Sequence, residues 1–255
     1  MLVLYLDLYY FQFVFVHFVS FFLLLLFSEV VSLVVTLSAV LQPRMTNLHA
    51  QGKKEEVRRV MSASMLFNSI LTFPVVVGIL LVSQEFVHMF LGKEYAETFI
   101  ALNIVVFSLI PIAFSEIVGR QTLIPTDNVR YFTISVMSGA VVSILLNFIV
   151  IPFGGYKGAA LVHVLVEIIV CALMSYYARK YLDIWALLRI AIKPLVTSVV
   201  TVIIVHLMFS YIWSISNSLL SLLLKIIVYS VIYGVLLLLT RTITQNEISM
   251  IRKTP

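Results

Sequence analysis

Charged residues are scarce in this chain: Asp, Glu, Lys and Arg make up 11% of its 255 residues, whereas soluble domains carry about 25%. The sequence also lacks a glycine-rich phosphate loop, a Gly-x-Ser-x-Gly element and a His-Glu-x-x-His pair. Without a phosphate loop the chain cannot by itself be an ATP-driven pump. We therefore expect no enzyme activity, no catalytic residue, no cofactor and no metal site.

Cysteine is almost absent as well, since Cys171 is the only one and lies inside an apolar run. A single thiol cannot form a disulfide within the chain, and neither a reactive thiolate nor a metal site is indicated. We assign Cys171 a packing role. The N-terminus lacks a basic segment and a small-residue cleavage site, which argues against a secretory signal peptide.

Hydrophobic residues, in contrast, make up 62% of the chain, and its mean hydropathy is +1.10. That many apolar residues would fill about seven membrane helices of about 20 residues each. Period-2 alternation is missing, so the spans are helical and the fold class is all-α, a polytopic membrane helix bundle. Apolar runs of spanning length fall at residues 62–83, 98–118, 132–152, 158–178, 194–213 and 218–240.

The first 42 residues are apolar almost throughout and too long for one span, because a single helix would be about twice as long as the bilayer core is thick. Either one span near 20–42 follows an irregular lead-in, or two spans meet near Ser28 and Glu29. Residues 1–28 are treated as an anomalous apolar lead-in, 29–240 as the membrane lobe and 241–255 as a tail.

Lys and Arg residues are distributed unevenly between alternate loops. One set of loops and the C-terminal tail hold 14 of them, the other set holds 2, and Lys225 lies within a span. By the positive-inside rule the richer loops and the C-terminus are cytoplasmic. The net charge of +5 therefore comes from basic loops that lie at the cytoplasmic membrane surface. We expect no nucleic-acid partner.

Ionisable residues within spans are costly and mark functional candidates. His163 and Glu167 are four residues apart and share a helix face, which suits a proton or cation relay or a hydrogen-bonded pair that fastens two helices. Lys225 either extends to the membrane surface or meets an anionic substrate. Glu116 and Arg120, also four apart, form either a local ion pair or a gate.

Polar and helix-bending residues add a second group of candidates. Asn103 and Asn147 are positioned to hydrogen-bond across helices within the bundle. Pro74 and Pro111 fall mid-span and predict kinks. Gly155, with small residues after it, predicts a turn followed by a closely packed helix start.

Several loop sequences are more specific than the composition. Pro43-Arg44-Met45-Thr46, which leads into a basic amphipathic segment, resembles the Pro-Arg-Met-Ser loop of bacterial polysaccharide flippases. These are exporters of lipid-linked oligosaccharides in the multidrug/oligosaccharidyl-lipid/polysaccharide, or MATE-like, superfamily. The similarity runs from about residue 29 to 240, and further matches lie at Phe73-Pro74, residues 119–126 and 131–135, Asn147, Ile151-Pro152, residues 155–160 and Glu167.

The resemblance implies a specific function. Family members have two lobes of helices around a central cavity and nearly twice as many spans, so this chain is similar to the C-terminal lobe only. A missing N-terminal lobe or a second subunit is the implied protein partner, as in a truncated or half-length form. The implied activity is export of a polyprenyl-pyrophosphate-linked oligosaccharide by alternating access, in the bacterial plasma (inner) membrane.

The resemblance also suggests roles for the candidate residues. Basic side chains facing the cavity suit a pyrophosphate, and gradient coupling needs a titratable group. The candidates are Lys225, Arg120, Asn103 and Asn147 for substrate and cavity contacts, Glu167 and His163 for coupling, and Glu116 with Arg120 for a gate.

Two alternatives stay open at this point. A drug/cation antiporter of the same superfamily would favour acidic cavity residues, and Glu167 is the only one deep in a span. A non-functional membrane fragment is the other alternative, and it would follow from the missing first lobe.

Overall fold

The computed structural model describes residues 31–32, 35–36, 38–90, 92, 98–211 and 218–240. Apart from short turns these residues are helical, and none of them forms a strand. The all-α prediction is therefore confirmed. Most of the proposed lead-in and first span, and the tail 241–255, lie outside the described residues.

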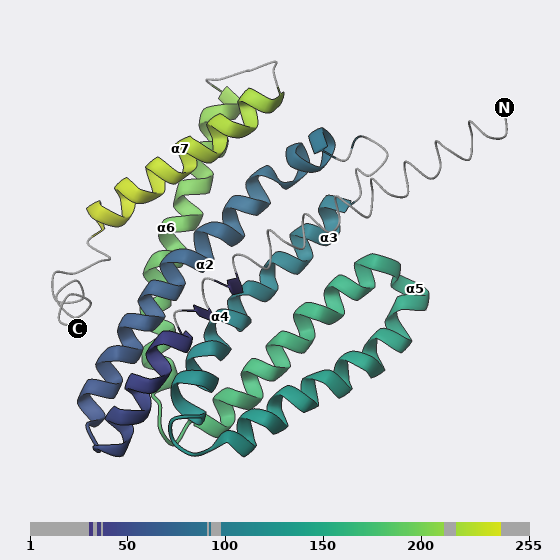
Figure 1. Cartoon of the computed structure of the whole chain (residues 1–255). Helices are drawn as coiled ribbons and strands as arrows, with labels where there is room; N and C mark the ends of the chain where they lie inside the picture. The colour runs from purple at the N-terminus through teal and green to yellow at the C-terminus, as the bar shows by residue number, and fades with distance from the viewer. Residues whose placement is uncertain are drawn as a thin grey trace.

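The described helices form a bundle in which most of them run roughly alongside one another (Figure 1). Helical residues 38–50 precede α2, which packs against α3, α4, α6 and α7. Five helical segments are long and apolar enough to cross a membrane, as the sequence predicted for a polytopic membrane bundle. The elements are α2 (Lys54–Phe90), α3 (Thr98–Val105), η2 (Val106–Ser108), α4 (Leu109–Val118), η3 (Gly119–Leu123), α5 (Val129–Ala178), α6 (Ile184–Tyr211) and α7 (Ser218–Leu239).

Helix α5 is a hairpin of two spanning arms rather than one long helix (Figure 1). The chain reverses at Gly155, whose φ of +52° and ψ of −142° lie in a region that glycine adopts far more readily than other residues. Each arm is long enough at about 1.5 Å per residue to cross the bilayer core. The two spans predicted at 132–152 and 158–178 are thus present, with the predicted turn between them.

Residues 98–123 form one spanning segment with two irregular turns. The 3₁₀ turn η2 lies just before Pro111, which cannot donate a backbone hydrogen bond to the preceding turn. The π-helical turn η3 follows α4 and ends the segment. Pro74, in contrast, lies inside α2, and the α-helix continues on both sides of it.

Two predicted helix boundaries are wrong. Residues 43–50, expected to be loop, are helical, and the chain turns only at Gln51 and Gly52. Helix α6 was expected to start near Pro194 but begins at Ile184. The Asp183 carboxylate caps this start by accepting a hydrogen bond of 3.1 Å from the Ala186 backbone N–H. Local capping thus extends α6 beyond the apolar run.

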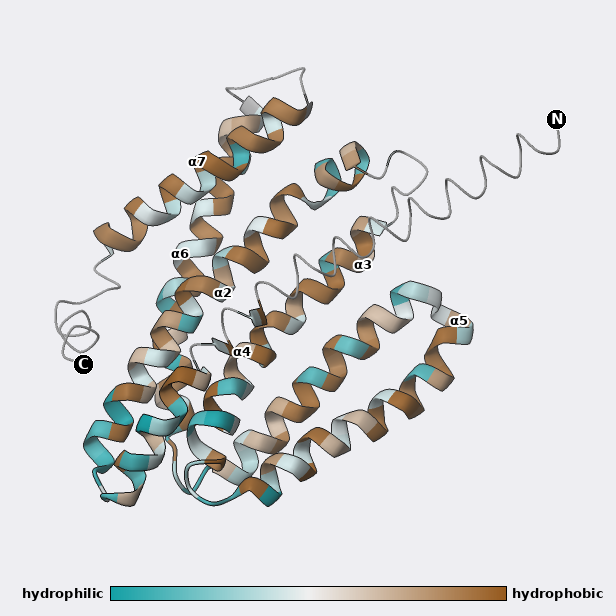
Figure 2. Ribbon diagram, viewed as in Figure 1, coloured by the Kyte–Doolittle hydropathy of each residue, from teal (hydrophilic) through white to brown (hydrophobic). Residues whose placement is uncertain are grey.

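One end of the bundle collects the turns at residues 51–53, 124–128 and 179–183, and we call it the basic end (Figure 1). Figure 2 shows hydrophilic residues concentrated there. All described Lys and Arg residues except Lys157 and Lys225 belong to the segments that meet at or near this end. A buried apolar cluster lies beneath it and includes Met45, Met61, Ile117, Leu123 and Met174.

The first arm of α5 presents a broad apolar surface. Phe148 and Phe153 are 83% and 92% exposed, and Ile144 and Leu145 are also exposed. An exposed apolar surface of this size is unfavourable in water and matches the hydrocarbon of a bilayer. The chain therefore has the surface of a multi-pass membrane protein.

Candidate functional site

Lys225 of α7 and Glu85 of α2 form an ion pair within the bundle, far from the basic end. The Lys225 side chain is 15% exposed and that of Glu85 is 38% exposed. The Lys225 ammonium also lies 5.5 Å from the ring centroid of Phe209 on α6. The positive charge of Lys225 on α7 therefore lies beside side chains of α2 and α6, and Glu85 is its counter-charge.

Lys225 could be predicted from its charge within a span, whereas Glu85 could not. Glu85 falls just after the apolar run 62–83, so hydropathy placed it in a loop, whereas α2 continues to Phe90. The two residues are 140 positions apart, and their pairing follows from the packing of α2 against α7. Neither span length nor local spacing contains that information. The second carboxylate oxygen, Glu85 Oε2, is buried and has no hydrogen-bond partner among the described residues.

Glu116 and Arg120 meet near the basic end, as their spacing predicted. Arg120 Nε and Glu116 Oε2 are 2.8 Å apart without the alignment of a hydrogen bond, so the contact is mainly electrostatic. Glu116 is the more buried partner, with 14% of its side chain exposed. Arg120 belongs to the π-helical turn η3, a type of turn that is frequent at functional sites.

The same π-helical turn is fastened to two other segments by buried polar contacts. The Gln121 amide donates a hydrogen bond of 3.1 Å to the Ser38 hydroxyl. The Thr122 hydroxyl contacts Met61 Sδ of α2 at 3.8 Å. Burial lowers the pKa of the His49 imidazole at this end below its ordinary value, because the charged form loses solvation.

His163 and Glu167 lie in the second arm of α5, where they interact electrostatically. Both side chains are half-buried. Nothing in the described residues brings this pair close to the Lys225–Glu85 pair, which is formed by α2 and α7. The candidate coupling residues and the candidate substrate residue therefore lie on different elements.

The two asparagines predicted to bridge helices behave differently. Asn147 Nδ2 donates to the Ser143 hydroxyl, 3.2 Å away on the same helix, so its contact is local and not across helices. Asn103 is half-buried in α3, and its Oδ1 has no partner among the described residues. Neither contacts Lys225 in a described hydrogen bond or ion pair.

Polar residues that the sequence analysis missed join α2 to its neighbours. Asn68 Nδ2 donates to the Ala113 carbonyl of α4 at 3.4 Å, and the Tyr233 hydroxyl of α7 donates to the Ile70 carbonyl at 3.1 Å. Small polar side chains permit close packing of membrane helices. Others buried in α2 and α6 are Ser64, Ser69, Thr72, Ser83, Thr197, Ser198 and Thr201.

Comparison with known proteins adds two findings. Residues 19–100 match a family model described as a polysaccharide biosynthesis protein. Among solved structures, the chain is similar to a lipid II flippase, MurJ, in an inward closed conformation, with a TM-score of 0.67 and 16% sequence identity. The fold is flippase-like. The match of residues 19–100 agrees with the polysaccharide-related family to which the loop motifs pointed, and the structural match shows that the fold is shared.

The structural match covers most of this chain but less than half of the flippase. It includes 83% of this chain and 44% of the flippase chain, so this chain spans less than half the length of the flippase. No curated protein sequence matches the chain. The partial coverage is compatible with a half-length form, and the assignment to the C-terminal lobe stays a prediction.

Proposed function

We propose that this chain forms a lobe of a membrane transporter that moves a polyprenyl-pyrophosphate-linked oligosaccharide across the bilayer. The observation that carries the proposal is the flippase-like fold, supported by the match of residues 19–100 to a polysaccharide biosynthesis family. The chain acts as a transporter and not as an enzyme. It lies in the bacterial plasma membrane with the basic end and the C-terminus on the cytoplasmic side.

Lys225 is the proposed contact for the pyrophosphate. A buried ammonium is costly without a counter-charge, and Glu85 supplies one when substrate is absent. A pyrophosphate is a stronger anion and can take over the contact with Lys225 through charge-assisted hydrogen bonds. When Lys225 leaves Glu85 and contacts the substrate, the ion pair that joins α7 to α2 is broken. Alternating access needs a local change of this kind.

Arg120, Glu116, Glu167, His163, Asn103 and Asn147 keep subsidiary roles in the proposal. Glu116 and Arg120 act as a gate at the cytoplasmic end, where the ion pair joins α4 to the π-helical turn. Glu167 with His163 serves gradient coupling, because both are titratable and half-buried. Asn103 and Asn147 contribute polar contacts along the substrate path.

The proposal is tested by export in a bacterial strain that lacks its own oligosaccharide flippase. The chain is expressed alone and together with a chain that supplies the remainder of the matched flippase, and surface polysaccharide is quantified by immunoblotting. We expect export in at least one of these arrangements. Membrane insertion is confirmed in each case, so that absence of export in both would overturn the proposal and favour a fragment without transport activity.

The Lys225→Ala variant sharpens this test. We expect export to fall by roughly tenfold or more, because hydrogen bonds to charged groups contribute about 1.5–3 kcal/mol and about 1.4 kcal/mol is tenfold. Lys157→Ala is the matched control, since Lys157 follows the α5 turn and lies 5.6 Å from the ring of its neighbour Tyr156. Equal export by both variants would remove Lys225 from the mechanism. Export of a cationic drug in place of glycan would favour the antiporter alternative.

A further inference from the structure

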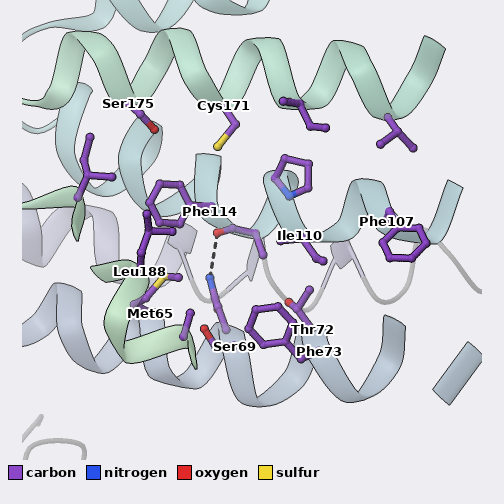
Figure 3. A pocket seen from close by; sticks show the side chains of 17 residues that line it. Met65, Ser69, Thr72, Phe73, Phe107, Ile110, Phe114, Cys171, Ser175 and Leu188 are labelled. Atoms are coloured by element: carbon purple, nitrogen blue, oxygen red, sulfur yellow. Dashed lines mark hydrogen bonds between the residues drawn. The ribbon is translucent and has the colours of Figure 1, made fainter. Parts of the chain in front are cut away.

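A cavity of about 470 Å³ lies between α2, α4, the second arm of α5 and α6 (Figure 3). Its volume falls in the range of small-molecule sites. The described side chains that line it are mostly apolar, and none of these described residues is charged. Lys225, Glu85, Glu116 and Arg120 all lie outside this lining, so the cavity is separate from the site described above.

The cavity is reached from the side of the bundle. Phe107, Ile168 and Leu188 belong to its lining and are 45%, 48% and 40% exposed, respectively. Phe107 and Ile168 lie within apolar segments that are long enough to span a membrane, and Leu188 lies in the first turns of α6. The described lining offers no counter-charge and is mostly hydrocarbon, so it favours a neutral ligand with a long apolar part.

Two polar atoms in the wall have no partner. Asn68 and Thr72 lie one turn apart on α2 and both line the cavity, which Figure 3 shows for Thr72. Asn68 Oδ1 and Thr72 Oγ1 are buried without a hydrogen-bond partner among the described residues. Asn68 uses only its amide nitrogen, which donates to the Ala113 carbonyl at 3.4 Å. An unpartnered acceptor in an apolar environment is unfavourable, so this wall suits a ligand that donates a hydrogen bond.

We propose that the cavity binds a neutral lipid alcohol, a hydrocarbon chain that ends in one hydroxyl group. The chain occupies the apolar part of the cavity, and the hydroxyl donates to Asn68 Oδ1 and accepts from the Thr72 hydroxyl. A hydroxyl group satisfies both atoms because it is donor and acceptor at once. This assignment does not depend on the proposed transport activity, since it uses neither Lys225 nor Glu85.

The test uses the purified chain in phospholipid vesicles and a long-chain alcohol that carries a photoreactive diazirine. After irradiation, adducts are mapped by mass spectrometry. We expect them to concentrate on lining residues such as Met65, Phe114 and Cys171, and to be displaced by excess dodecanol far better than by dodecane. Adducts spread evenly over the exposed first arm of α5, or equal displacement by alcohol and alkane, would overturn the proposal.

Variants of the polar pair locate the hydroxyl. Thr72→Val keeps the shape of the side chain and removes its hydroxyl, and Asn68→Leu removes the carbonyl acceptor. Each is expected to lower cavity labelling by roughly tenfold, which corresponds to the loss of about one hydrogen bond in an apolar site. Thr133→Val is the matched control for Thr72→Val, because the Thr133 hydroxyl donates to the Val129 carbonyl in the first arm of α5 and Thr133 is not among the lining residues.

Thermal unfolding of each variant shows whether it folds. If Asn68→Leu does not fold, labelling of Thr72→Val alone tests whether the hydroxyl binds at this wall. Undiminished labelling in Thr72→Val would contradict the assignment. Because export is not measured here, a failure of this test would leave the proposed transport function standing, and the reverse also holds.

Discussion

Replacing Glu85 with glutamine is expected to lower the free energy of unfolding of the chain by about 1–3 kcal/mol, because it leaves Lys225 buried without a counter-charge. This loss is smaller than the loss for a fully buried pair, because the Glu85 side chain is 38% exposed and solvent screens its charge. The measurement is the thermal unfolding midpoint of the purified protein in lipid nanodiscs. Transport should fall as well, since Lys225 would no longer be held between α2 and α7.

A double variant separates charge from packing. Glu85→Gln combined with Lys225→Met removes both charges and is expected to be more stable than Glu85→Gln alone, because neither charge is left uncompensated. The control is Lys53→Gln, which breaks the exposed ion pair between Lys53 and Glu56, 3.7 Å apart, and should change stability by about 0–1 kcal/mol. A Glu85→Gln variant as stable as this control would show that the pair contributes nothing.

Gly139 is expected to be the position most sensitive to an added methyl group. A Cβ atom there would lie 2.3 Å from Val170 Cγ2, on the facing arm of α5, which is far inside van der Waals contact. Gly139→Ala should therefore push the two arms apart and destabilise the protein by about 1–3 kcal/mol, although alanine favours helix in general. The unfolding midpoint in nanodiscs measures this effect.

Gly234→Ala is the matched control for that variant. Gly234 lies in α7 with nothing within 4 Å of the added Cβ, so alanine should be neutral or slightly stabilising. If Gly139→Ala behaves like Gly234→Ala, the two arms of α5 do not pack as closely as described.

The general architecture could be predicted because it depends on composition. Spans follow from the length of apolar runs, and the α5 hairpin follows from Gly155 between two such runs. Helix ends were predicted less well, since α6 starts at Ile184 where Asp183 supplies a cap outside the apolar run. Hydropathy detects the hydrocarbon-spanning part of a helix and not the turns that extend beyond it.

The candidate site was predicted only in part, for a related reason. Glu116 and Arg120 are neighbours on one helix, so their spacing is sufficient to predict their contact. Lys225 was identified by its charge within a span, but its partner Glu85 comes from a helix far away in the sequence. The cavity beside Asn68 and Thr72 likewise depends on how four segments pack. Such contacts require the tertiary structure.

We propose that this chain is a lobe of a transporter for a lipid-linked pyrophosphate, and transbilayer movement in proteoliposomes tests this proposal most directly. A fluorescent polyprenyl-pyrophosphate glycolipid is incorporated with the chain, alone and with the remainder of the matched flippase, and dithionite quenching reports movement between leaflets. We expect movement faster than in protein-free vesicles in at least one of these conditions, reduced roughly tenfold by Lys225→Ala and unchanged by Lys157→Ala. Movement no faster than in protein-free vesicles under both conditions would contradict it.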